Sequence, residues 1–413
     1  MQYHRWVSVR DLRPEDVGQN IPIYAVWEIT LQCDQACGFC GSRAAKARPD
    51  ELTLDEMKSV ADQLAALGTR EVTLIGGEAY LRPELPELIS HLDSLGLRVG
   101  IQTAGRGLTV ELASRLKAAG LATLGVSVNG PAEVHDILHG RRGAYAEALA
   151  AIDAAVGAGL ITSTNSQICR LNVHFIREIV RDVRAHGVKI WRPGLVVPMG
   201  RAADHPQWLL QPYQVLEIID TVAAIQLEAV AEARQQGLPV TEAFEVQGDN
   251  TLGYFGPHEE VIRSRPGGLR QHYQGCQAGQ SSIGIESDGT IKACPSLPTR
   301  PYDGGNIRDA PLANIWNDSP ELRFTRDRST DELWGFCKTC YYADDCRAGC
   351  SFNAHTTMGK RGNNPFCYHR ASQLRRRGVR EVLVQVERAS GEPYDFGRFE
   401  IREEPWDPAT AKN

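Results

Sequence analysis

The stretch CDQACGFC at residues 33–40 places Cys33, Cys37 and Cys40 in a C-x3-C-x2-C pattern, and no fourth cysteine lies nearby. Iron–sulfur clusters are usually held by four cysteine thiolates, so three would leave one iron open to a further ligand. A structural zinc site is the alternative, but it usually takes four ligands arranged as C-x2-C pairs. The odd number of cysteines and the three-residue gap therefore favour a cluster with an open iron.

The sequence on either side of this stretch alternates between strand-like and helix-like segments. Strands are predicted at residues 24–31, 71–75, 98–103, 122–128, 161–167 and 189–197, and helices at 53–67, 110–119, 144–156, 173–186 and 211–237. The first helix begins with Thr53 and Glu56 in the spacing of a capping box. Repeated strand–helix units predict a parallel α/β sheet. Because a full barrel of this type has eight units and the chain offers six, we expect a partial, open (β/α)6 TIM-like barrel followed by a small cysteine-rich domain.

The composition limits the class of protein. The chain has 413 residues, a net charge of -6 and a pI near 6.0, so no basic surface for nucleic acid is expected. No apolar run reaches the length of a membrane span, and the polar N-terminus does not resemble a secretory signal. We therefore expect a cytoplasmic protein, in which eleven cysteines indicate metal binding or catalysis rather than disulfides.

The cysteines also suggest how the chain is divided. Three lie in residues 33–40, Cys169 stands alone, and seven fall between Cys276 and Cys367. The predicted organisation is an N-terminal extension (1–23), the partial barrel (24–240), a Gly- and Pro-rich bridge (241–275), the cysteine-rich domain (276–385) and a C-terminal tail (386–413).

Several polar motifs follow the predicted strands at their C-terminal ends, where functional groups gather in such sheets. With the cysteine stretch and Gly76-Gly77-Glu78, they make the chain resemble a radical S-adenosylmethionine (SAM) enzyme. The resemblance implies that Cys33, Cys37 and Cys40 hold a [4Fe-4S] cluster whose free iron binds SAM, which is then cleaved to methionine and a 5′-deoxyadenosyl radical. The residues that it implies in SAM binding are Phe39, Gly76, Gly77, Glu78, Thr103, Ser127, Asn129 and Arg141. Each of the last four could instead cap a strand end or open a helix.

The later cysteines resemble the SPASM domain of peptide-modifying radical SAM enzymes. Their order is Cys276, Cys294, then Cys337-x2-Cys340-x5-Cys346-x3-Cys350, and finally Cys367. The resemblance implies one auxiliary [4Fe-4S] cluster on Cys337, Cys340, Cys346 and Cys367, and a second on Cys276, Cys294 and Cys350. The second set lacks a fourth cysteine, so an iron is open there or another ligand completes it. Zinc ribbons are the alternative.

Cys169 has two interpretations. A free cysteine usually packs as a small, inert hydrophobe, but its position near the predicted rim would also allow it to return a hydrogen atom to a substrate radical.

The resemblance further implies that the substrate is a ribosomally made peptide, which would be crosslinked through a thioether or carbon–carbon bond or epimerised. The expected partners are this peptide, an external electron donor of the flavodoxin or ferredoxin type, and a separate leader-peptide-binding protein. A non-peptide substrate, such as an aminoglycoside sugar or a tetrapyrrole side chain, is the second hypothesis. A non-catalytic iron–sulfur or zinc protein is the third.

Overall fold

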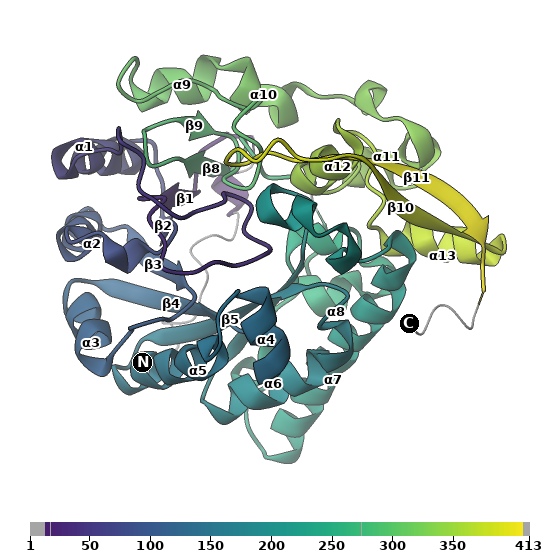
Figure 1. The fold of residues 1–413 in the computed structure, drawn as a ribbon, viewed down its shortest axis with the longest axis horizontal. Coiled ribbons are helices and arrows are strands. Elements are labelled where there is room, and N and C mark those ends of the chain that lie inside the picture. Colours follow the sequence, from purple (N-terminus) through teal and green to yellow (C-terminus); the bar gives the residue numbers. More distant parts are fainter. Residues whose placement is uncertain (1–12, 17, 274, 408–413) are drawn as a thin grey trace.

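The computed structural model describes residues 13–16, 18–273 and 275–407, and its main feature is a sheet of nine strands in the order β7-β6-β5-β4-β3-β2-β1-β8-β9 (Figure 1). The six predicted strands are present as β1 (Tyr24–Glu28), β2 (Glu71–Ile75), β3 (Arg98–Thr103), β4 (Leu121–Ser127), β5 (Ile161–Ile168) and β6 (Ile190–Leu195). They pair in parallel with their neighbours in chain order. The predicted open α/β barrel is thus confirmed, since the sheet of the described residues ends at two edges and does not close.

Helices follow each of these strands, and most of them lie on the outer side of the sheet (Figure 1). They are α1 (Leu54–Ala66), α2 (Leu85–Ser94), α3 (Val110–Ala118), α4 (Ala132–Leu138), α5 (Ala144–Gly157), α6 (Ile176–Ala185) and α7 (Val215–Gln235). In α1 the predicted capping box is formed by Thr53 and Glu56, which satisfies backbone donors of the first turn. Its residues Met57, Val60 and Leu64 are fully or almost fully buried against the sheet.

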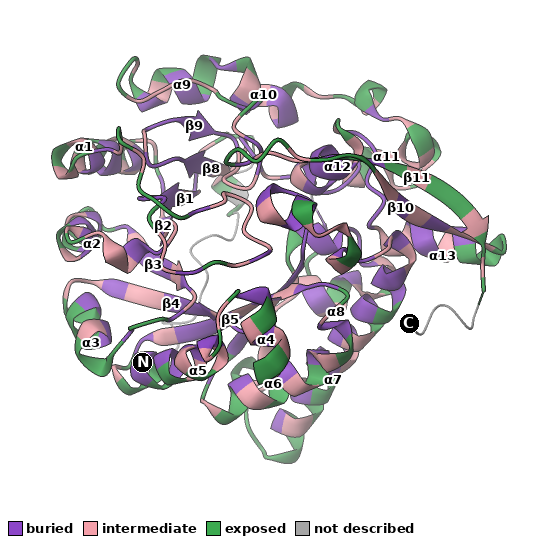
Figure 2. Ribbon diagram, viewed as in Figure 1, coloured by how far each residue is buried: buried purple, intermediate pink, exposed green. Residues whose placement is uncertain are grey.

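The two faces of the sheet differ in polarity. Residues on the outer face, such as Trp27, Val72 and Val126, are buried in the hydrophobic core beneath the helices. Residues on the inner face, such as Gln102 and Asn165, are only half-buried. Across the structure the strands are mostly buried or intermediate, and exposed residues concentrate on the surrounding helices (Figure 2). The inner face is therefore the surface on which a ligand could be received.

The sheet continues beyond the six predicted strands. Residues 241–275 are predicted to form a Gly- and Pro-rich bridge, and in the structure they contribute β7 (Glu245–Val246), which pairs with β6, and the short helix α8 (Glu259–Arg263). On the other side, β8 (Ser282–Ile285) pairs in parallel with β1, and β9 (Ile291–Lys292) pairs with β8 in the antiparallel sense. The cysteine-rich part of the chain thus begins as an extension of the barrel sheet.

Buried charges stabilise this seam between β1 and β8. The guanidinium of Arg48 lies 3.1 Å from a carboxylate oxygen of Glu28 and 2.8 Å from one of Glu286. The ammonium of Lys292, which is fully buried, lies 2.6 Å from Glu286. Removing one partner from such a buried network leaves an uncompensated charge, which is strongly destabilising.

The rest of the chain forms short helices and a hairpin. The helices are α9 (Leu312–Asp318), α10 (Pro320–Asp327), α11 (Ala343–Cys346), α12 (Ser351–Met358) and α13 (Tyr368–Arg376), and the hairpin joins β10 (Val379–Glu387) to β11 (Arg398–Pro405). Between the two hairpin strands the chain returns to the barrel, where the backbone N–H of Tyr394 donates to the carbonyl of Gly41 at 3.2 Å. Of the helices described, none has the length and hydrophobicity needed to cross a membrane.

Candidate functional site

The cysteine stretch forms a loop directly after β1. The loop begins with a hydrogen bond from the backbone N–H of Cys33 to the carbonyl of Ala45 (3.1 Å). Burial raises the pKa of the Cys33 thiol to about 12 and also raises the pKa of Cys37, and the neighbouring cysteines add to both effects. The raised pKa values mean that Cys33 and Cys37 resist ionisation on their own. A bound metal cluster would supply the positive charge that deprotonates them, so the donor set fits an iron–sulfur cluster.

Gly76 and Gly77 bring the end of β2 against this loop. A Cβ atom on Gly77 would lie 1.8 Å from the carbonyl oxygen of Gln32, and one on Gly76 would lie 2.7 Å from that of Thr30. The next residue, Glu78, donates its backbone N–H to the same Gln32 carbonyl at 2.8 Å. Only glycine fits at these positions, because any side chain would collide with the backbone of Thr30 or Gln32, which leads into Cys33.

Glu78 is a buried carboxylate at the carboxyl end of the sheet. Its oxygens accept hydrogen bonds from the hydroxyl of Thr103 and from the backbone N–H of Ala104, each at 2.7 Å. Burial raises the pKa of Glu78 to about 7, although these two hydrogen bonds lower it. A cationic group placed beside Glu78 would relieve this desolvation, so the residue suits an ammonium ligand such as that of SAM. Thr103 acts here by orienting Glu78.

The other predicted SAM-binding residues differ in burial and in the protein groups that they contact. Phe39 packs edge-on against the ring of His139, with centroids 5.4 Å apart. Asn129 is fully buried, and both its side-chain polar atoms contact other protein groups. Ser127 is half-buried at the end of β4. The Arg141 guanidinium forms a two-pronged ion pair with Glu147. Asn129 and Arg141 are thus already held by protein partners.

His139 is a site residue that the sequence patterns did not single out. Its Nδ1 atom lies 3.4 Å from the sulfur of Cys37, and its ring stacks on that of His135 with centroids 4.0 Å apart. Burial lowers the pKa of His139 to about 4 and that of His135 to about 2, so both rings are neutral near pH 7. The four-residue spacing between His135 on α4 and His139, which caps the carboxyl end of this helix, is the signal that could have identified them.

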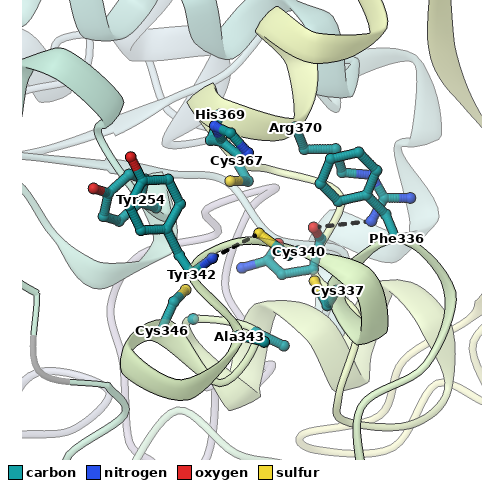
Figure 3. Close-up of a pocket in the computed structure, with 13 residues that line it drawn as sticks. Tyr254, Phe336, Cys337, Cys340, Tyr342, Ala343, Cys346, Cys367, His369 and Arg370 are labelled. Carbon is teal, nitrogen blue, oxygen red and sulfur yellow. Dashed lines mark hydrogen bonds between the residues drawn. The ribbon is translucent and has the colours of Figure 1, made fainter.

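Four cysteines of the C-terminal region line one pocket (Figure 3). They are Cys337, Cys340, Cys346 and Cys367, the set implied for one auxiliary cluster. The backbone N–H of Tyr342 donates to the sulfur of Cys340 at 3.4 Å. Arg370 lies beside the pocket, paired with Glu381 at 2.6 Å, and its charge lowers the pKa values of Cys337 and Cys367, which burial raises more strongly.

The remaining three cysteines form a separate group. Burial raises the pKa of Cys350, and the nearby Cys276 and Cys294 raise it further. Asp249, just after β7, also contributes to this rise. In residues 13–16, 18–273 and 275–407, no three His, Cys, Asp or Glu side chains are arranged to hold a single metal ion. The described cysteine groups have the all-thiol composition that iron–sulfur clusters use.

Cys169 is fully buried at the end of β5 and belongs to the hydrophobic core. Burial raises the pKa of its thiol to about 11. These observations fit an inert, packed cysteine better than a hydrogen donor to substrate.

A row of polar side chains crosses the inner face of the sheet. Asn165 on β5 donates to Gln102 on β3, passing over Gly125, which has no side chain to obstruct the contact. On β6, Arg192 donates to the Ser163 hydroxyl at 2.9 Å and to the side-chain oxygen of Gln247 at 2.8 Å. Because their backbones align in register, these residues line one surface that amide and hydroxyl groups dominate. No sequence motif marks this row, since single polar residues on strands are common.

Two parts of the chain match known protein families. Residues 27–185 match the radical SAM superfamily, and residues 276–341 match the SPASM iron–sulfur cluster-binding domain. Both parts bind [4Fe-4S] clusters, and the first binds SAM. These matches agree with the resemblance and place the cysteine loop, Gly77 and Glu78 in the first part.

Several curated proteins are similar over most of their length. The AdoMet-dependent heme synthase of Methanosarcina barkeri is 29% identical over 354 residues, which is 85% of this chain and 97% of that protein. The mycofactocin maturase MftC of Mycobacterium ulcerans is 27% identical over 354 residues, which is 85% of this chain and 89% of that protein.

Solved structures share the fold. SuiB of Streptococcus suis bound to S-adenosylmethionine superposes with a TM-score of 0.62 at 17% identity, covering 84% of this chain and 76% of SuiB. The enzyme anSMEcpe, with AdoMet and a Cp18Cys peptide, gives a TM-score of 0.62 at 14% identity, covering 85% of this chain and 95% of that chain. At these identities the likeness concerns the fold.

Proposed function

Because the chain belongs to the radical SAM superfamily and carries a SPASM domain, we propose that it is a cytoplasmic enzyme that modifies a ribosomally made peptide. When bound, the cluster and SAM supply a 5′-deoxyadenosyl radical that removes a hydrogen atom from the substrate. In this proposal Cys33, Cys37 and Cys40 hold the cluster, and Glu78 holds the SAM ammonium group in a buried position.

The inner face of the sheet supports a peptide as the substrate. Its polar row consists mainly of amide and hydroxyl groups, which match the donors and acceptors of a peptide backbone. Arg192, which hydrogen-bonds Ser163 and Gln247, adds a positive charge to this row. The mycofactocin maturases among the relatives and the peptide-bound SuiB and anSMEcpe structures are consistent with this assignment.

A tetrapyrrole is the second candidate, because the heme synthase of M. barkeri is similar over nearly its whole length. A related protein from the same organism is named an Fe-coproporphyrin III synthase. Coproporphyrins carry several carboxylates, which call for several available cations. Three basic side chains, Arg48, Lys292 and Arg141, are instead engaged with Glu286 or Glu147, so these cations are already paired with carboxylates of the protein, which favours the peptide.

The test is anaerobic turnover of the reconstituted protein with SAM and dithionite. The enzyme assignment predicts 5′-deoxyadenosine without any substrate, and its absence from protein with full iron content would contradict that assignment. Mass spectrometry of a co-expressed candidate peptide then tests the substrate. Loss of two hydrogens would indicate a crosslink, and deuterium uptake in D2O without other change would indicate epimerisation. Conversion of iron coproporphyrin III, with every candidate peptide unchanged, would overturn the peptide proposal.

Arg192→Gln separates substrate binding from SAM cleavage. We expect the basal formation of 5′-deoxyadenosine to stay within about twofold of the wild type, because Glu78 and the cysteine loop are unaltered. Peptide modification should fall about tenfold or more, as expected for the loss of one charge-assisted hydrogen bond. Arg181→Gln, at an exposed site on α6, is the matched control.

A further inference from the structure

The contact between His139 and Cys37 has a defined direction. His139 is almost fully buried, with 1% of its surface exposed. Its Nδ1 atom faces the Cys37 sulfur at 3.4 Å, and its Nε2 atom faces the side-chain nitrogen of Asn129 at 3.0 Å. Which ring nitrogen carries the hydrogen decides whether His139 donates to the sulfur or presents a lone pair to it.

The hydrogen bonds of Asn129 determine that choice. The backbone N–H of Gln167 points at one side-chain atom of Asn129 at 2.8 Å, so that atom must be the oxygen. The other atom is therefore the NH2 group, which donates to Nε2 of His139. A neutral imidazole that accepts at Nε2 carries its hydrogen on Nδ1. His139 thus directs an N–H donor at the Cys37 sulfur.

The surroundings keep His139 in this orientation. The His135 ring stacks on it almost in parallel, with an interplanar angle of 4°, and Phe39 packs edge-on against it. His135 is itself fixed, since its Nδ1 atom accepts the backbone N–H of Asn129 at 3.1 Å. One asparagine therefore holds both histidines, through its backbone and its side chain.

We propose that His139 donates an Nδ1–H hydrogen bond to the Cys37 thiolate and thereby raises the reduction potential of the SAM-binding cluster. Hydrogen bonds to sulfur are one of the ways in which a protein sets this potential. The hydrogen bond offsets negative charge on the sulfur, which makes it easier for the cluster to accept one electron from the external donor. His139 is then a positioning residue for radical formation. The proposal rests on Cys37 as a cluster ligand, and the identity of the substrate does not enter it.

Three variants of the full-length holoenzyme separate the hydrogen bond from packing. His139→Leu fills similar volume without a donor. His139→Asn can place an amide N–H where Nδ1 lies, and so is the rescue variant. His135→Phe alters the stacking partner and leaves the donor in place. Iron content is measured first, and all three should keep about twelve irons per chain, as expected for three cubanes.

The first readout is the midpoint potential of the SAM-responsive EPR signal. We expect it to fall in His139→Leu, to return towards the wild-type value in His139→Asn, and to stay unchanged in His135→Phe. A shift of about 59 mV would change the reduced fraction tenfold for a one-electron couple. With a flavodoxin as donor, 5′-deoxyadenosine formation by His139→Leu should then drop about tenfold, and a stronger chemical reductant should restore it.

The second readout is independent of activity. In protein labelled with 15N in its histidine rings, pulsed EPR of the reduced SAM-binding cluster should show a nitrogen coupling that disappears in His139→Leu and persists in His135→Phe. An unchanged coupling and potential in His139→Leu would overturn the proposal. So would an equal fall in potential in all three variants, because that pattern reports altered packing. A wild-type protein with this coupling but without SAM cleavage would refute the enzyme assignment alone.

Discussion

Arg43 and Asp395 form an ion pair, with Nε and Oδ1 2.8 Å apart, that ties the cysteine loop to the segment between the last two strands. Their side chains are 12% and 7% exposed, and the same guanidinium also pairs with Asp204 at 2.6 Å. Arg43 follows Cys40 by three residues. The shape of the loop therefore depends on a segment far away in the sequence.

Arg43→Ala should destabilise the protein and loosen the cysteine loop. Removing one partner of a buried pair leaves the other charge uncompensated, so we expect a loss of about 3 kcal/mol in the free energy of unfolding. Urea denaturation of the reconstituted protein measures the loss, and iron analysis should show faster release from the loop. Arg181→Ala removes an exposed pair with Asp182 and should change the free energy of unfolding much less, because solvent screens exposed ion pairs. Equal effects of the two changes would contradict this role of Arg43.

Gly77→Ala should abolish SAM binding. The added Cβ would lie 1.8 Å from the Gln32 carbonyl oxygen, so the end of β2 must move away from the cysteine loop and carry Glu78 with it. We expect at least a hundredfold loss of SAM affinity by equilibrium dialysis and a lower melting temperature. Gly157→Ala is the control, because nothing lies within 4 Å of its added Cβ at the end of α5. That change should be neutral or stabilise by up to about 1 kcal/mol.

SAM affinity should depend on pH through Glu78, whose pKa burial raises to about 7. Only the ionised carboxylate pairs with an ammonium group, so affinity should rise as the pH increases from 6 to 8. Stability of the ligand-free protein should change in the opposite sense. The folded state favours the protonated form of Glu78. This contribution to the free energy of unfolding is complete below pH 4.5, the pKa of the carboxyl in the unfolded chain, and is lost as the pH rises through 7.

Glu78→Gln tests both effects, since glutamine can still accept from Thr103 but does not titrate. We expect SAM binding to weaken about 10- to 100-fold and its pH dependence between 6 and 8 to vanish. Calorimetric titration at three pH values measures this. Glu84→Gln, whose side chain is 39% exposed, should retain wild-type binding. A pH dependence that survives in Glu78→Gln would assign the titration to another group.

Cys340→Ser should remove one auxiliary cluster and leave SAM binding intact. Cys340 shares its pocket with Cys337, Cys346 and Cys367, so we expect the iron content to fall from about twelve to about eight per chain. The 5′-deoxyadenosine yield without substrate should remain within about twofold. Cys169→Ser, in the core and away from these pockets, should keep the full iron content. Loss of iron in Cys169→Ser would reveal a role for that thiol.

The local parts of this fold could be predicted from the sequence, and the long-range contacts could not. Thr53 and Glu56 predict the start of the first helix, because a capping box involves only residues within one turn of each other. The strand β7 could not be predicted, because two residues are too few to show the alternation of apolar and polar side chains that marks a strand. The Gly76-Gly77 pair was identified, but its contact with the Gln32 backbone follows only from the packing of β2 on the loop.

The candidate site shows the same division. The spacing of the cysteines predicts three ligand sets. In the structure Cys337, Cys340, Cys346 and Cys367 line one pocket, and Cys276 and Cys294 lie near Cys350; their roles as cluster ligands stay a prediction. His139 and the polar row around Arg192 depend on which side chains the folded sheet brings together. A single histidine or arginine in a sequence does not indicate which side chains will lie beside it in the folded protein.

The contacts of Tyr394 and Asp395 with the cysteine loop have a consequence for how the enzyme is made. The ribosome reaches Asp395 about half a minute after Cys40, at typical rates of synthesis, and until then Arg43 lacks this partner. The cysteine loop can therefore reach its final shape only when nearly the whole chain has been made, because its anchor at Arg43 is completed by one of the last residues to leave the ribosome.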